Sequence, residues 1–198
     1  MNHGIRVIGI VLFVMAGILA ATVPAEAQLI NEGFEGATFP PDGWASFNGV
    51  ADLGYKEWMQ SSTLPHTGTY SAFIEYDNID PNAIAEDWLV TPQLFPSATD
   101  STLTFWMRQS FSGDYGTEYT IRVSTASQTT HADFTTIQTW VEADFDTTYS
   151  QQSIDLSAYI GQGIYVAFVM AQDDGDNWHI DDVAGVPVPV ELMSFEIE

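Results

Sequence analysis

Residues 103–108 read LTFWMR, and their apolar and polar side chains alternate in the period-two pattern of a β-strand with one buried face. Residues 119–124, YTIRVS, repeat this alternation, and a third period-two series runs from Tyr70 to Tyr76. Residues 164–170, IYVAFVM, are apolar on both faces, which is typical of a central strand. These segments predict a protein built from β-strands.

Turn signals rich in Gly, Pro, Asn and Asp separate these segments from further strand candidates. The turn signals are GATFPPDG (36–43), LPHTGT (64–69), DNIDPN (77–82), SGDYG (112–116) and QDDGDN (172–177). The further strand candidates are residues 29–35, 44–47, 57–60, 87–91, 137–142 and 178–183. No segment has the pattern of a long amphipathic helix, so the sequence predicts an all-β fold, an antiparallel β-sandwich.

The two ends of the chain differ from this pattern. Residues 1–27 combine Arg6, the apolar run 7–21 and the small-x-small site Ala25-Glu26-Ala27, as a cleaved secretory signal peptide does. The apolar run is short for a membrane span, so we expect no membrane insertion after cleavage. We expect one domain over residues 28–185, followed by a Pro-rich extended tail, 186–198, that opens a linker or a further module.

The composition excludes several classes of protein. The chain has 27 Asp and Glu against 4 Lys and Arg, a net charge of −23, and no cysteine. Disulfide scaffolds and Cys-ligated metal sites are therefore excluded, and nucleic acid is not an expected partner because its phosphates require a basic face. Self-repulsion on so acidic a surface is relieved by salt or by bound cations, which makes calcium a plausible partner.

Several motifs stand in a characteristic order. They are NEGFEG (31–36), FPPDGW (39–44), HTGTYSA (66–72), DWLVTP (87–92), GQGIYVAF (161–168) and WHIDDV (178–183). This series resembles the choice-of-anchor J family, also called cleaved-adhesin domains, over about residues 30–183. These are jelly-roll sandwiches similar to the adhesin modules of gingipain-type proteases and, more distantly, to MAM domains and carbohydrate-binding modules. The resemblance implies a non-catalytic adhesion or ligand-binding module, frequently with structural calcium.

Carried over by position, Glu35 in the first strand and Asp181 and Asp182 in the last would hold that calcium. A jelly roll places its first and last strands side by side, and carbonyls of a turn such as 66–70 would add oxygen ligands. The alternative is that these acids are solvated charges at strand ends. In the loop 173–177, Asp173, Asp174 and Asp176 are secondary candidates; a plain acidic turn is favoured because the bidentate Glu of an EF-hand is missing.

Aromatic side chains are the candidates for contact with a ligand. Most tryptophans of a sandwich belong to the core, but Trp58 and Trp106 are the two to consider for stacking on a sugar ring. Trp106 alternates with Phe105 and Met107, so we expect it on a half-exposed sheet face.

Catalysis has little support in the sequence. Glu75, Asp77 and Asp80 resemble the E-x-D-x-x-E strand of jelly-roll glycosidases, but the third acid is shorter and Pro81 follows at once. Motifs of serine hydrolases, metalloproteases and nucleotide-binding enzymes are missing. We therefore expect a secreted or cell-surface module that binds an extracellular protein or glycan. The alternatives are a carbohydrate-binding module of a polysaccharide-degrading system and a divergent glycosidase.

Overall fold

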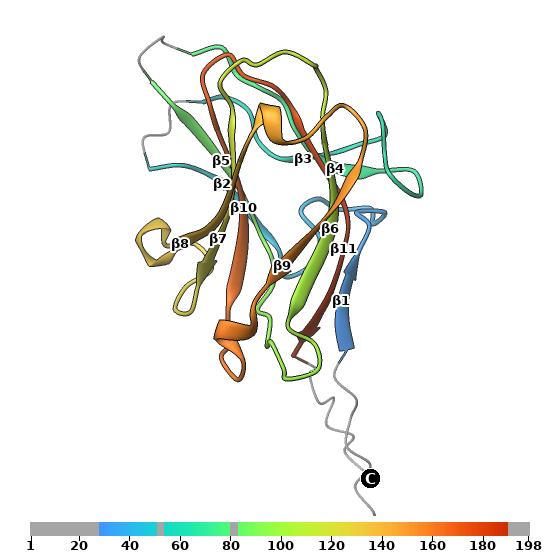
Figure 1. The fold of residues 1–198 in the computed structure, drawn as a ribbon, viewed down its shortest axis with the longest axis vertical. Coiled ribbons are helices and arrows are strands. Elements are labelled where there is room, and N and C mark those ends of the chain that lie inside the picture. The colour runs from blue at the N-terminus through green and yellow to red at the C-terminus, as the bar shows by residue number, and fades with distance from the viewer. Residues whose placement is uncertain (1–27, 51–53, 80–82, 190–198) are drawn as a thin grey trace, which may run out of the picture.

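The computed structural model describes residues 28–50, 54–79 and 83–189, which form two antiparallel sheets packed face to face (Figure 1). Sheet A has the order β3-β4-β11-β6-β9, with β1 also paired to β11, and sheet B has the order β2-β5-β10-β7-β8. The strands of sheet A are β1 (Gln28–Glu32), β3 (Met59–Ser61), β4 (Ser71–Ile74), β6 (Thr102–Gln109), β9 (Ser150–Asp155) and β11 (Trp178–Val188). Those of sheet B are β2 (Ala45–Asn48), β5 (Ala85–Val90), β7 (Glu118–Ser124), β8 (Thr135–Val141) and β10 (Tyr165–Gln172).

The helical segments of the described residues are three short 3-10 turns, η1 (His131–Asp133), η2 (Glu142–Asp144) and η3 (Ser157–Tyr159). The predicted all-β, antiparallel jelly-roll sandwich is therefore confirmed. Among the described residues, no helix has the length and apolar character needed to cross a membrane. The predicted signal peptide and residues 190–198 of the predicted tail lie outside the described residues.

The predicted alternation decides which side chains fill the space between the sheets. Leu103, Phe105 and Met107 of β6 are fully buried in the main core, together with Phe168 of β10 and Trp178 of β11. β10 is the central strand of sheet B, as predicted for the doubly apolar run. The side chains of β10 that point away from the main core pack into a second, smaller cluster on the outside of sheet B. This cluster consists of Trp88, Val90, Ala167 and Val169, flanked by Ala45, Phe47, Phe134 and Tyr165.

The last strand differs from the prediction in its length. β11 continues to Val188, beyond the predicted domain end at residue 185. Its second half pairs with β1, with Leu29 opposite Pro187, and the Pro187 carbonyl oxygen accepts the Phe95 N–H at 2.8 Å. Residues 186–188 of the predicted Pro-rich tail therefore belong to the strand. Pro187 has no backbone N–H to donate to the ladder, and its carbonyl oxygen is used as an acceptor.

One acidic side chain lies inside the sandwich without compensation. Asp87 of β5 is 1 % exposed, and neither carboxylate oxygen has a hydrogen-bond partner among the described residues. Burial raises the pKa of Asp87 to about 7, and repulsion from Asp77, Glu57 and Glu86 adds to this shift. The folded protein therefore retains a proton on Asp87 at pH values where the unfolded chain has released it.

We predict that stability falls as pH rises from about 4 to about 7 because of Asp87. Replacing the residue in Asp87→Asn removes this dependence. The free energy of unfolding of the variant relative to wild type should rise by about 4 kcal/mol between pH 4 and pH 8, at roughly 1.4 kcal/mol per pKa unit. Urea denaturation across this pH range measures the difference. The exposed Asp133→Asn is the control, and a pH-independent difference for Asp87→Asn would contradict the prediction.

Candidate functional site

β11 changes its pairing partner halfway along its length. Trp178–Ile180 pair with β4, whereas Val183–Val188 pair with β1 on the same side of the strand. Asp181 and Asp182 lie between the two pairings, where the register against β6 also shifts. Asp182 adopts a left-handed backbone conformation, with φ of 49°. The break places two acidic side chains where β1 ends and where the loop from β3 to β4 passes.

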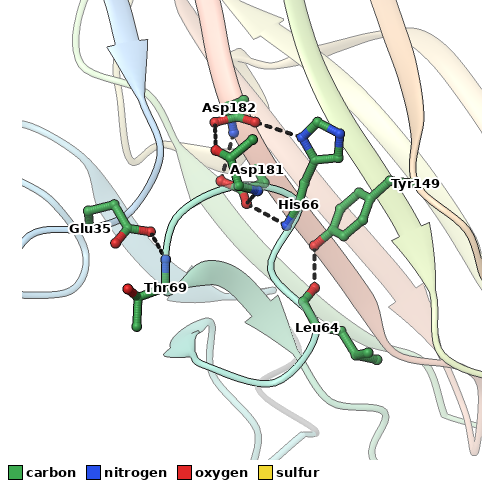
Figure 2. Close-up of polar contacts among 8 residues, drawn as sticks. Glu35, Leu64, His66, Thr69, Tyr149, Asp181 and Asp182 are labelled. Atoms are coloured by element: carbon green, nitrogen blue, oxygen red, sulfur yellow. Dashed lines mark hydrogen bonds and ion pairs between the residues drawn. The ribbon is translucent and has the colours of Figure 1, made fainter.

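The carboxylate of Asp181 holds this loop by its backbone. Oδ2 accepts the N–H groups of His66 at 2.8 Å and Thr67 at 3.2 Å, and Oδ1 accepts the N–H of Asp182 at 2.8 Å (Figure 2). Asp181 is fully buried. Burial raises its pKa, while the three N–H donors act in the opposite direction because they stabilise the charged form.

Glu35 and Asp182 hold the same loop from two further sides. Glu35 Oε1 accepts the N–H groups of Thr69 at 2.9 Å and Tyr70 at 2.8 Å. Asp182 lies 2.7 Å from His66 Nδ1 through Oδ2 and accepts the Thr67 hydroxyl at 2.7 Å through Oδ1. The three predicted metal-ligand residues therefore meet around one loop, which we call the clamped loop, residues 62–70.

Gly68 allows the close approach between the clamped loop and Glu35. Its φ is 62°, and a Cβ atom at this position would overlap the Glu35 carboxylate. A side chain here would therefore be opposed by both the backbone conformation and the space available.

Aromatic stacking fixes the outer side of the clamped loop. The His66 ring stacks on Trp106, with centroids 4.0 Å apart and planes 16° apart, and Tyr149 meets His66 edge-on at 5.1 Å. The Tyr149 hydroxyl donates to the Leu64 carbonyl oxygen at 2.8 Å, and Arg108 lies over the Tyr149 ring at 5.8 Å. Burial is the main reason that the pKa of Tyr149 rises to about 12, so it stays a neutral donor. Half-buried Trp106 lies on the outer face of sheet A, where its ring is in contact with His66.

Trp58 was predicted as a ligand contact, but the structure places it in the core. It is 4 % exposed, its ring lies 5.5 Å from that of Trp178, and its Nε1–H donates to the Asp87 carbonyl oxygen at 3.1 Å. The expectation that Trp58 offers its ring face to a ligand is therefore wrong. The burial of Trp58 could not be read from the sequence, because the residue precedes a short strand and its neighbours show no clear alternation of apolar and polar side chains.

The secondary metal-ligand candidates do not gather. Asp174 is exposed, Asp173 is half-buried, and Asp176 is fully buried, where it accepts the backbone N–H groups of Ser110 and Phe111. Within residues 28–50, 54–79 and 83–189, no group of three or more His, Cys, Asp or Glu side chains has the arrangement of a metal site. Asp176 here, and Asp181 and Glu35 at the clamped loop, act as acceptors for loop amides.

The predicted fold relationship is borne out by comparison with solved structures. The K3 cleaved adhesin domain of Lys-gingipain from Porphyromonas gingivalis W83 is 21 % identical, with a TM-score of 0.61, and the match covers 79 % of this chain and 97 % of that domain. The K1 domain of the same protein is 18 % identical, with a TM-score of 0.62, covering 82 % and 100 %. The CBM22-1 xylan-binding domain of Paenibacillus barcinonensis Xyn10C is 10 % identical, with a TM-score of 0.52, covering 83 % and 97 %.

No family model and no curated protein matches the sequence. At these identities, the similarity to solved structures establishes a gingipain-type adhesin fold and leaves the function to the residues of this chain.

We predict that Gly68→Ala destabilises the protein more than Gly161→Ala. Both positions have left-handed φ, which costs about 1–2 kcal/mol for alanine, but the space around a Cβ at Gly161 is open. At Gly68 the methyl group also displaces Glu35 from two backbone N–H groups, at about 1 kcal/mol each. Chemical denaturation should show an additional loss of about 2 kcal/mol for Gly68→Ala. Equal losses for the two variants would contradict the clamp.

Proposed function

We propose that the protein is a secreted, non-catalytic binding module that holds an extracellular protein or glycan ligand outside the cell or at its surface. One observation carries this proposal: the acidic side chains that the fold brings together accept hydrogen bonds from loop backbone. Asp181 and Glu35 hold the clamped loop, and Asp176 holds residues 110–111. Carboxylates used in this way rigidify loops at the sheet ends, and rigid loops suit recognition.

The fold neighbours support the same conclusion. Two of them are adhesin domains and one is a xylan-binding domain, and each is matched over nearly its whole length. Adhesion to a protein is the first candidate activity. Carbohydrate binding is the second, favoured by an aromatic pocket described below.

The residues considered for glycoside hydrolysis are engaged elsewhere. Glu75 lies just after β4 rather than within it and pairs with Lys56 Nζ at 2.5 Å. Asp77 is buried and accepts the Tyr55 backbone N–H. Asp80, the third acid of the series, lies outside the described residues. These contacts support a structural role for Glu75 and Asp77 and do not favour their use as the nucleophile and acid of a glycosidase.

We expect no hydrolysis of soluble β-glucans, xylan or ester substrates by the protein. A reducing-sugar assay and a chromogenic ester assay measure this, with Glu75→Gln as a nearly isosteric comparison. Wild type and variant should both stay at the buffer baseline. Turnover by wild type that disappears in Glu75→Gln would overturn the non-catalytic proposal.

We further propose that calcium binds at Glu35, Asp181 and Asp182. Calcium prefers oxygen ligands, and each ionised carboxylate has about four lone-pair sites, so hydrogen bonds from loop amides leave capacity for a cation. Two of the basic side chains of the described residues are paired elsewhere, Lys56 with Glu75 and Arg122 with Glu86, and the third, Arg108, lies over the Tyr149 ring at the edge of the clamped loop. In a chain of net charge −23, Asp182 is hydrogen-bonded to His66, while Asp181 and Glu35 accept loop backbone N–H groups and have no basic ion-pair partner among the described residues. The three carboxylates do not form a metal cluster in the described structure, so calcium would have to draw them together. Bound calcium would neutralise them and stabilise the clamped loop.

Calcium should raise the melting temperature at fixed ionic strength. At a free concentration of about 100 times Kd, mass action adds roughly 2.7 kcal/mol, which corresponds to about 5–10 °C for a domain of this size. Calorimetry in excess calcium and in chelator measures the shift. Glu35→Gln should reduce it strongly, whereas Glu75→Gln, an exposed acid away from the site, should leave it unchanged. An identical melting temperature in calcium and chelator would exclude the ion.

A further inference from the structure

A second region of the fold has the features of a ligand pocket. Three connections meet there: the chain after β4, the β6–β7 connection and the β10–β11 connection. They enclose a cavity of about 220 Å³ lined by Tyr76, Phe111, Tyr115, Asp174 and Gly175. Phe111 is 43 % and Tyr115 is 52 % exposed. Large aromatic side chains this exposed, gathered around one cavity, are typical of a binding site.

The aromatic rings stand edge-to-face around the cavity. The Phe111 centroid lies 6.2 Å from that of Tyr76, with planes 69° apart, and 6.2 Å from that of Tyr115, with planes 75° apart. Because the rings are tilted against one another, a ligand in the cavity can contact the face of one ring and the edge of another. Asp174 adds a carboxylate that can accept hydrogen bonds from hydroxyl groups.

Buried side chains hold the backbone that carries two of these rings. Asp176, fully buried, accepts the Phe111 N–H at 2.9 Å and the Ser110 N–H at 3.1 Å. Its neighbour Asn177 accepts the Tyr76 N–H at 2.9 Å through Oδ1. The β10–β11 connection therefore fixes residues that belong to two other connections.

The third ring is held from the other side. Glu142, 2 % exposed, accepts the N–H groups of Tyr115 and Thr117. The Thr117 hydroxyl in turn accepts the Asp176 N–H at 2.7 Å. A Cβ atom on Gly175 would overlap that hydroxyl, so only glycine lets the β10–β11 connection pass this close. All three aromatic residues thus have their backbone N–H bonded to a buried side chain, and the pocket is formed before a ligand arrives.

We propose that this pocket binds a neutral saccharide unit of an extracellular glycan. The inference rests on the proposed binding function and names the ligand class. Tyrosine and phenylalanine rings pack on the apolar faces of pyranose rings, and Asp174 accepts a sugar hydroxyl. The cavity is smaller than the ~300 Å³ lower bound for drug-sized ligands, so it suits a short segment of a chain. The net charge of −23 repels uronate-containing and sulfated glycans.

The test is a glycan array followed by calorimetric titration. The array carries neutral xylo-, gluco-, manno- and galacto-oligosaccharides and, for comparison, uronate-containing and sulfated ones. Wild type should bind at least one neutral series and no anionic one. Phe111→Ala and Tyr115→Ala should each weaken that binding about tenfold or more. Tyr55→Ala is the matched control, because Tyr55 is a more exposed aromatic residue outside the pocket, and it should change Kd less than twofold.

A second measurement needs no variant. Titrating wild type with the bound oligosaccharide should shift the amide NMR signals of residues 111–117 and 173–176 and leave those of residues 55–59 in place.

Binding of a neutral glycan that survives both pocket substitutions would overturn the pocket and leave the proposed binding function intact. Binding of anionic glycans alone, or of no glycan while a protein ligand is captured on a parallel protein array, would also overturn the saccharide proposal only. Hydrolysis of the bound glycan would overturn the proposed non-catalytic function itself.

Discussion

The hydrogen bonds from the His66 and Thr67 amides to the Asp181 carboxylate are the interaction on which the site depends. β11 leaves β4 after Ile180 and joins β1 at Val183, so the ladder is interrupted for two residues. Backbone N–H groups beside such a break need acceptors, because a buried donor without a partner costs about 1–3 kcal/mol. Asp181 supplies the acceptor from within the strand itself. The partner switch and the clamped loop therefore require each other.

The same device recurs at the aromatic pocket. There Asp176 and Glu142, both buried, accept N–H groups from the β6–β7 connection, which carries Phe111 and Tyr115. This use of carboxylates gives a physical role to part of the acidic excess of the chain. A hydrogen bond to a charged acceptor is stronger than one between neutral groups, so a few buried acids can order long connections without cysteine cross-links. The cost is charge repulsion, which salt or a bound cation relieves.

Much of this architecture could be predicted from the sequence, because strand alternation is a local property. The buried face of LTFWMR and the central position of residues 164–170 followed from side-chain pattern alone. Glu35, Asp181 and Asp182 were expected on the first and last strands, which a jelly roll pairs. The structure ends β1 at Glu32, so Glu35 reaches the clamped loop from the connection after that strand. The His66 stack on Trp106 could not be predicted, since it depends on the path of a loop. Of the pocket residues, Tyr115, Asp174 and Gly175 sit in turn signals, Phe111 directly precedes one, and Tyr76 ends the alternating series 70–76. At such positions no periodicity indicates which way a ring points.

Native-state hydrogen exchange measures how firmly the carboxylates hold the clamped loop. Among the described residues, no strand pairs with the loop at His66, Thr67, Thr69 and Tyr70, so the protection of these amides depends on the carboxylates of Asp181 and Glu35. We expect these four amides to exchange as slowly as amides in the strands of sheet A, with opening free energies that approach that of global unfolding. Exchange at the rate of exposed turns would contradict this expectation.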